Sequence, residues 1–176
     1  FPEYSGKTVM FDYSEIRPKG SYLKSSGGKA PGPDPLKNAL TSIKKTLDSA
    51  VKNGQKKLKP IQAYDIVMFG ADAVISGGVR RSATICVFSA DDEEMAKAKT
   101  GNWFTENPQR GRSNNSALLL RNETTKEQFS KLMESVKEFG EPGFVWSDST
   151  ELIVNPCVEI GMWPVDEKTG ETGWQA

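Results

Sequence analysis

The chain has 176 residues, and its 23 basic residues balance its 23 acidic residues, so the formal net charge at pH 7 is zero. This balance argues against a nucleic-acid-binding protein that depends on overall positive charge, and any anion site would have to be local. No apolar run approaches the roughly 20 residues that cross a bilayer, and the N-terminal FPEYSGK lacks the pattern of a signal peptide. Two cysteines are too few for a disulfide framework, which fits a reducing compartment. We therefore expect a soluble, cytoplasmic protein that binds neither membrane nor nucleic acid.

The sequence contains no histidine. Nucleophiles that depend on a serine–histidine or cysteine–histidine pair are therefore excluded. Zinc sites with histidine ligands are excluded too, and two cysteines cannot complete a site built from cysteine alone. The chain begins at Phe1 and ends at Ala176 without a polar tail, so we expect it to be a piece of a longer protein.

The first 33 residues combine one apolar run with a long loop. The β-rich run TVMFDY, residues 8–13, predicts a short strand. Residues 17–35, rich in glycine, serine and lysine, predict a loop. A strand followed by a long loop is thus expected at this end of the chain.

Two helices are predicted next. Asp34 is a suitable N-cap, and Pro35 suits the first turn. The first helix should end near Gly54. Its apolar residues recur at helical spacing: Leu36, Leu40, Ile43, Leu47 and Val51. The apolar segment 61–75 predicts a second, more buried helix.

The second half of the chain alternates predicted strands and helices. We first expect a buried parallel strand in VRRSATICVF (79–88), then a helix in DDEEMAKAK (91–99) closed by Gly101, and then a long polar loop at 102–115. A strand in SALLL (116–120) follows, and after it a helix with Thr124 and Glu127 as its capping box and Gly140 as its stop. The last predicted strands are at 144–146 and 151–154. This alternation predicts an α/β fold with mainly parallel strands.

Three polar or glycine-rich segments have both a structural and a functional interpretation. The cluster SSGGKAPGP (25–33) could cradle phosphate, but Leu23 and Ala30 stand where a Walker A motif requires other residues, and such clusters are more often flexible connections. The segment SGGVRRS (76–82) could be a tight turn with solvated arginines or a functional loop. The loop 102–115 mixes aromatic, amide and guanidinium groups, which suits recognition of a base and a phosphate, although long loops can also be disordered.

The two cysteines occupy different contexts. Cys86 lies in the apolar run ATICVF and is predicted to be a small buried hydrophobe. Cys157 lies in NPCVEI, between Asn155 and Glu159. Because Pro156 disfavours helix for the residue before it, we predict an extended segment in which the amide, thiol and carboxylate share one face of an enclosed pocket. Burying polar neighbours such as these costs free energy, which favours a functional role for the group. The alternative is that Cys157 is a buried structural cysteine.

Five segments together resemble the catalytic subunit of ribonucleotide reductases, most closely the adenosylcobalamin-dependent class. In chain order they are SEIRPKGS, SSGGKAPGP, SGGVRRSA, RSNNSALL and NPCVEI, and the resemblance covers essentially the whole chain. It implies part of a ten-stranded α/β barrel. The implied division is 1–33 for a strand and a first effector loop, 34–100 for helices and the SGGVRR strand, 101–116 for a second effector loop, and 117–176 for a strand, a helix and a finger loop with a radical cysteine.

The resemblance assigns the chemistry to NPCVEI. Cys157 would become a thiyl radical and abstract the 3′ hydrogen of a ribonucleoside diphosphate or triphosphate, on the way to deoxyribonucleotides for DNA synthesis. Glu159 would act as general base on the 3′ hydroxyl, and Asn155 would bind the ribose hydroxyls or the glutamate. A thiyl radical must be shielded while it touches one C–H bond, with a base in reach of the adjacent hydroxyl.

The resemblance also implies partners. A deoxynucleoside triphosphate effector would contact Arg17 and Lys24 through its phosphates and Gln109, Arg110 and Arg112 through its base. The helix from Pro35 is a candidate element of a homodimer. Adenosylcobalamin would bind largely outside this chain, and a thioredoxin-type reductant would regenerate a cysteine pair that the chain lacks, so we expect the isolated chain to be inactive until joined to the remaining segments. A nucleotide-binding regulatory module without catalysis is the alternative.

Overall fold

The computed structural model describes residues 6–7, 9–24, 27–75, 82–162, 169 and 174–175. Its elements, in chain order, are α1 (Asp34–Lys52), α2 (Pro60–Ile75), β1 (Thr84–Ser89), α3 (Glu93–Ala96), α4 (Trp103–Glu106), the 3-10 helix η2 (Pro108–Arg112), β2 (Ser113–Leu120), α5 (Lys126–Phe139), β3 (Gly143–Ser147), β4 (Ile153–Val154), β5 (Gly161–Met162) and β6 (Trp174–Gln175). Among the described residues, no helix is long and apolar enough to cross a membrane.

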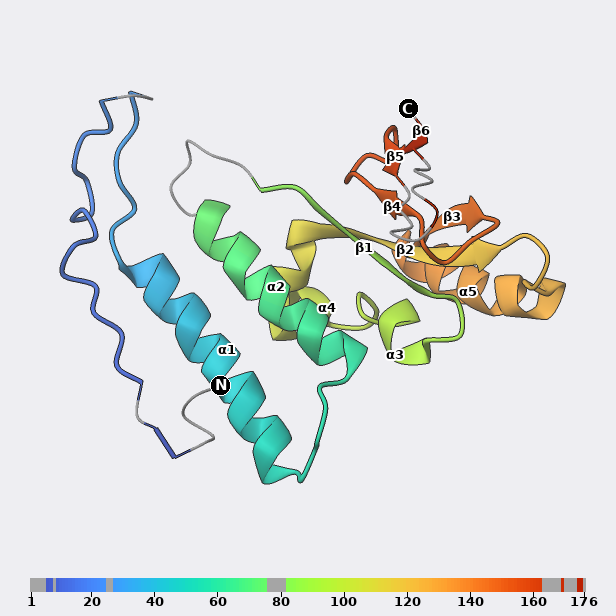
Figure 1. Cartoon of the computed structure of the whole chain (residues 1–176), viewed down its shortest axis with the longest axis horizontal. Coiled ribbons are helices and arrows are strands. Elements are labelled where there is room, and N and C mark those ends of the chain that lie inside the picture. The colour runs from blue at the N-terminus through green and yellow to red at the C-terminus, as the bar shows by residue number, and fades with distance from the viewer. Residues whose placement is uncertain are drawn as a thin grey trace.

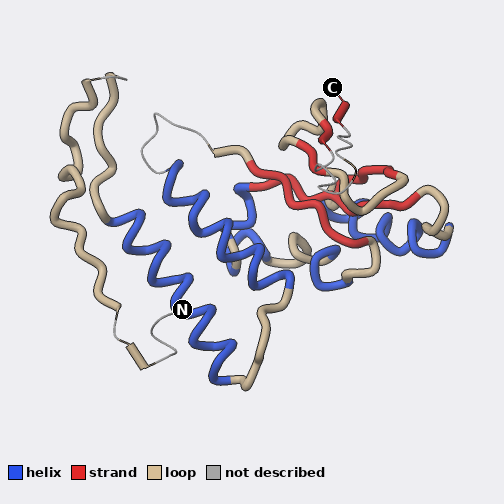
Figure 2. The backbone as a smooth tube through the Cα atoms, viewed as in Figure 1, coloured by secondary structure: helices blue, strands red, loops and turns tan. Residues whose placement is uncertain are grey.

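The strands form two small sheets. In the first, β2 lies between β1 and β3 and pairs with both in parallel, with Ser116 opposite Val87 on one side and opposite Gly143 on the other. In the second, β5 pairs antiparallel with β4 and β6. Parallel strands separated by helices confirm the predicted α/β class (Figure 2). The ten-stranded barrel stays a prediction.

The two faces of the parallel sheet have different neighbours. Figure 1 shows α3 and α5 below the sheet and the small sheet β4–β5–β6 above it. Because side chains alternate along a strand, Ala117 and Leu119 of β2 point to the helices, whereas Asn114 and Ser116 point to the opposite face. The position of the small sheet on that opposite face is what places NPCVEI beside the amino end of β2.

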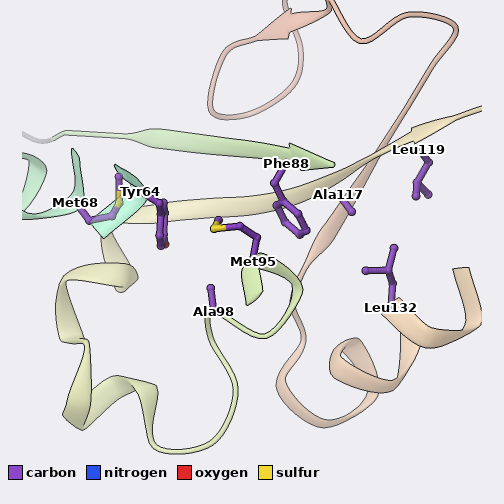
Figure 3. Packing of buried hydrophobic residues seen from close by; sticks show 8 residues of the cluster. All are labelled: Tyr64, Met68, Phe88, Met95, Ala98, Ala117, Leu119 and Leu132. Atoms are coloured by element: carbon purple, nitrogen blue, oxygen red, sulfur yellow. The ribbon is translucent and has the colours of Figure 1, made fainter. Parts of the chain in front are cut away.

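The hydrophobic core lies between the parallel sheet and the helices. Its buried members are Tyr64, Met68, Phe88, Met95, Ala98, Ala117, Leu119 and Leu132. In Figure 3, Phe88 and Ala117 point from β1 and β2 toward Met95, and Leu119 faces Leu132 of α5. Removing this apolar surface from water is the main stabilising contribution here, and it fixes β2 as the central strand.

The two long helices are confirmed, with differences in detail. The helix cap of α1 is Pro33 rather than Asp34, which is already helical and makes no side-chain cap hydrogen bond. The predicted greater burial of α2 is right on one side only, because Tyr64 and Met68 are buried while Val67 and Val74 are exposed. An all-round apolar sequence predicts burial, but only neighbouring elements decide which side is covered.

The N-terminal strand prediction is wrong for the described residues 9–13, which have no strand conformation. Met10 and Phe11 are exposed there. A β-rich sequence needs a partner strand to hold its backbone hydrogen bonds, and no described strand lies alongside. The loop after it is confirmed, with one isolated bridge between Tyr22 and Lys29.

Between β1 and β2, the sequence prediction needs two corrections. The helix predicted at 91–99 is a single turn, α3, capped by the Asp92 side chain, so Gly101 lies beyond its end and does not close it. The predicted long polar loop at 102–115 is instead α4, η2 and the start of β2, which extends three residues before Ser116. Short helical turns of polar residues carry too little apolar periodicity to be recognised from sequence.

The helix α5 agrees closely with its prediction. The capping box is present but is one residue later than expected, with Thr125 as N-cap and Gln128 as its partner. Gly140 ends the helix in a left-handed conformation, as expected, with φ 75°. The strand predicted at 79–88 is β1, parallel as expected but at an edge of the sheet, where only Phe88 is fully buried.

Candidate active site

The segment NPCVEI is the turn of a hairpin between β4 and β5, not an extended segment. The Val158 N–H donates to the Asn155 carbonyl at 2.9 Å, and the Asn155 N–H donates to the Ile160 carbonyl at 3.1 Å. Val158 adopts φ 66°. The prediction of an extended conformation is therefore wrong. Asparagine followed by proline is also a turn signal, because proline fixes the φ required at the second position of a turn.

The turn nevertheless brings the three predicted groups together. The pKa of Glu159 lies below its ordinary value, chiefly through its own backbone N–H and to a smaller extent through the nearby side chains of Asn155 and Cys157. The Asn155 carboxamide oxygen meanwhile accepts from the Ile160 N–H at 2.9 Å. The carboxylate is thus charged at neutral pH and ready to accept a proton.

Cys157 and Glu159 are both exposed, and Asn155 is half-buried. The predicted enclosure of the Cys157 thiol is therefore absent within the described residues, although the thiol does border a hollow of about 340 Å³ beside the parallel sheet. The lining residues come from four places: Ile85 of β1, Asn114, Asn115 and Ser116 of β2, Gly140, Glu141 and Gly143 before and in β3, and Pro156, Cys157 and Val158 of the hairpin.

One hydrogen bond attaches the hairpin to the sheet. The Asn114 side-chain amide donates to the Pro156 carbonyl at 3.0 Å. Asn114 belongs to the RSNNSALL segment, so two of the segments that suggested the family meet at this contact. Each segment is recognisable in the sequence, but no local signal indicates that the two are in contact.

Behind the sheet, a buried polar network fixes the start of β2. The Lys99 ammonium, only 7% exposed, donates to the Ser113 carbonyl and to Glu141 Oε1 at 2.8 Å. The Ser113 hydroxyl hydrogen-bonds to the Tyr64 hydroxyl at 2.8 Å and to Asn115 Oδ1 at 2.7 Å. Burial raises the pKa of Tyr64, so this hydroxyl stays protonated and available as a donor. Sequence reasoning missed this network because the contacts that join its separate elements link residues 14 to 49 positions apart.

The predicted effector residues on η2 are bound to α2. Arg110 makes a bidentate ion pair with Asp65, at 2.8 Å and 2.7 Å, and also donates to the Ala98 carbonyl. Gln109 is buried and donates to the same Asp65 carboxylate at 3.0 Å. Arg112, more exposed, pairs with Asp72 at 2.7 Å. Among the three, Arg112 is therefore the most accessible to a ligand.

Arg17 and Lys24 are exposed and make no hydrogen bond or ion pair within the described part of the chain. Figure 1 shows their segment on the outer side of α1, with α1 and α2 between it and α4. The structure thus does not bring these two residues together with Gln109, Arg110 and Arg112. The arginines of SGGVRRS, residues 80 and 81, lie outside the described residues.

Cys86 is partly buried and packs against the core cluster on the helix side of β1. Burial raises the pKa of its thiol, which disfavours the reactive thiolate. This agrees with its predicted role as a small hydrophobe, although its burial is incomplete. Across the described residues, no group of three or more histidine, cysteine, aspartate or glutamate side chains could hold a metal ion.

The fold and this hairpin define a segment of an α/β protein with an accessible cysteine held beside a carboxylate. Comparison with known proteins identifies the family. The chain is 35% identical over 173 residues to an adenosylcobalamin-dependent ribonucleoside-triphosphate reductase of Euglena gracilis, which covers 86% of this chain and 22% of that protein. It is 37% identical over 142 residues to the enzyme of that name from Lacticaseibacillus paracasei, and 31% identical over 144 residues to the one from Lactobacillus leichmannii, covering 80% and 82% of this chain and 18% of each relative.

The chain belongs to the adenosylcobalamin-dependent ribonucleotide reductase family, as the resemblance of its five segments predicted. It spans about a fifth of the length of the curated relatives that it matches. No family model and no solved structure matches the chain.

Proposed function

We propose that this chain supplies the radical-cysteine hairpin of a ribonucleotide reductase that converts ribonucleoside triphosphates to deoxyribonucleotides. The observation that carries the proposal is that one tight turn, closed by backbone hydrogen bonds, holds Asn155, Cys157 and Glu159 within five residues, with Cys157 at the edge of a hollow beside the sheet. The relatives are named for reduction of ribonucleoside triphosphates, which favours the triphosphate over the diphosphate as substrate.

In the proposed reaction, the Cys157 sulfur, as a thiyl radical, takes the 3′ hydrogen atom of the ribose. The C–H bond breaks, an S–H bond forms, and the unpaired electron moves to the sugar carbon. Glu159 then accepts the proton of the 3′ hydroxyl on the same carbon; its lowered pKa keeps it in the unprotonated form that this role requires. The Asn155 side-chain oxygen accepts from the Ile160 N–H, and Asn155 contributes to the lowered pKa of Glu159, so we assign it to holding the turn and its carboxylate rather than to the ribose.

The relatives' names specify adenosylcobalamin. When bound, this cofactor would supply the oxidising equivalent that turns the Cys157 thiol into a thiyl radical. We propose that its binding surface lies in the larger part of the protein outside this chain. The same part would cover the exposed Cys157 thiol, because a thiyl radical needs shielding from water, and would carry the cysteine pair that a thioredoxin-type reductant restores.

For regulation, we propose a deoxynucleoside triphosphate effector held by Arg17 and Lys24, whose exposed cationic groups suit phosphates. Because α1 and α2 separate Arg17 and Lys24 from η2 within one chain, Arg112 would sense the base of the same effector only across a dimer, positioned by Gln109 and Arg110 through their contacts with α2. The amphipathic α1 is the proposed dimer element. Coupling between the effector and the substrate would be reciprocal, so each would tighten binding of the other.

The decisive experiment replaces Cys157 by serine in the full-length protein. We expect reduction of ribonucleoside triphosphates to be abolished, because a serine hydroxyl does not form the required radical, while substrate and effector binding persist. Cys86→Ala is the matched control, since Cys86 lies on the other face of the sheet, and it should retain reduction. Turnover in the Cys157→Ser protein would reject the catalytic proposal. Nucleotide binding without reduction even in the unsubstituted full-length protein would favour the regulatory module.

A further inference from the structure

The hollow beside Cys157 is lined on the sheet side by residues of β2, among them Asn114 and Ser116. Ser116 and Asn114 point to the hairpin face of β2, because residues two apart along a strand share a face. The Asn114 amide is engaged with the Pro156 carbonyl. Ser116 borders the same hollow as Cys157 and is not one of the catalytic or effector residues named so far.

Ser116 is only 7% exposed, yet its hydroxyl makes no hydrogen bond within the part of the chain that the structure describes. The hydroxyl oxygen is not fully enclosed, because the fully buried side-chain atoms without a partner among the described residues are Asn115 Nδ2 and Glu141 Oε2. Ser116 borders the hollow, so its unpaired hydroxyl can form a hydrogen bond with a ligand there. A serine hydroxyl can both donate and accept, so its natural complement is a neutral polar group such as another hydroxyl.

The neighbouring strand keeps the Ser116 hydroxyl uncovered. Gly143, the partner of Ser116 in β3, has no side chain, and a Cβ at that position would lie 2.9 Å from Ser116 Oγ. The backbone of Gly143 does not adopt a positive φ, so no conformational need explains the glycine. A side chain at this position would force the Ser116 hydroxyl to move, so the glycine lets the hydroxyl keep its place beside the hollow.

We propose that Ser116 Oγ binds a hydroxyl of the sugar that reacts at Cys157, and that Gly143 allows the Ser116 hydroxyl to stay in the position that this contact needs. This inference rests on the proposed function, since it assumes that the reacting ligand is a ribonucleotide. Ser116 is then a positioning residue: it orients the sugar from the sheet side, opposite the hairpin. Glu159 and Cys157 act on that sugar from the hairpin side.

The test measures equilibrium binding to the full-length protein without adenosylcobalamin, so that no turnover occurs. The probes are cytidine triphosphate and its 2′-deoxy and 3′-deoxy analogues. Ser116→Ala should weaken cytidine triphosphate binding about threefold to tenfold, the effect of one hydrogen bond. At least one analogue should bind the variant and the original protein equally, because it lacks the hydroxyl concerned. Equal losses for all three probes, or no loss for any, would overturn the proposal.

Gly143→Ala provides a second, independent variant. The added methyl group should cover the Ser116 hydroxyl and cause the same selective loss, and it should cause little further loss when combined with Ser116→Ala. Fully additive losses would count against the proposal. Ser135→Ala on α5 is the matched serine control and should change no affinity.

These outcomes are separable from failure of the proposed function. Retained reduction by the Cys157→Ser protein would remove the proposed chemistry whatever Ser116 does. Abolished reduction in that protein, together with unselective effects at Ser116, would remove only the Ser116 assignment.

Discussion

Two polar regions of this molecule, η2 and the turn 155–160, hold their charged groups in opposite ways. In η2, Arg110 and Gln109 satisfy a carboxylate on α2 that is more than 40 residues away in sequence. In the turn, Asn155 and Glu159 find partners within five residues, and Glu159 stays exposed. Polar groups that hold two elements together are unavailable to a ligand, whereas groups organised within one turn keep a face open. A loop rich in polar residues is thus weak evidence for binding until its partners are known.

The largest expected effect concerns the pair of Arg110 and Asp65, whose side chains are each only 14% exposed. Arg110→Ala should lower the free energy of unfolding by about 2–4 kcal/mol, because the Asp65 carboxylate loses its charged partner while remaining largely buried. Urea unfolding would measure this loss. Arg121→Ala is the control: its pair with Asp148 is exposed and should contribute less than about 1 kcal/mol. Similar losses in both variants would contradict the distinction between the two kinds of site.

A smaller effect is expected at the turn itself. Asn155→Ala removes a side chain that lowers the pKa of Glu159, together with the acceptor of the Ile160 N–H, so the pKa of Glu159 should rise toward its ordinary value. Carbon-detected NMR titration of the Glu159 carboxyl group would measure the change. Asn122→Ala, at an exposed position after β2, should leave that pKa unaltered.

The sign of the corresponding pH dependence follows from the lowered pKa. Because the folded turn favours the charged form of Glu159, its contribution to stability is present above the unfolded pKa and is lost as pH falls through the folded pKa. Amide exchange of Ile160 should therefore accelerate, relative to its intrinsic rate, on acidification through that range. In Asn155→Ala this pH dependence should be weaker, and an unchanged dependence would show that Asn155 does not hold the carboxylate.

The smallest structural effect is expected at Arg112, whose pair with Asp72 is exposed. Arg112→Ala should change unfolding in the absence of ligand by less than about 1 kcal/mol. In the full-length protein it should nevertheless reduce the thermal stabilisation by deoxynucleoside triphosphates, measured by melting with and without the nucleotide. Stabilisation equal to that of the unsubstituted protein would reject Arg112 as an effector residue.

Local signals in the sequence were sufficient for the helices α1, α2 and α5. Apolar spacing placed them, and the left-handed Gly140 ends α5 where expected. The parallel strands β1 and β2 were also recognisable from their β-branched and aliphatic residues. Each of these features depends on residues within one or two turns of each other, which is the range over which propensity and capping act.

The sequence by itself also determined the family and put Asn155, Cys157 and Glu159 in one short segment. Tertiary structure decided how they meet: the antiparallel pairing of β4 with β5 closes a turn, so the groups converge on Glu159 by reversal of the chain rather than along an extended segment. Tertiary structure also decided that Arg110 forms an ion pair with Asp65 and that Ser116 lines the same hollow as the hairpin. Such contacts join residues about 40 positions apart, and their partners are selected by the packing of whole elements, which no local pattern encodes.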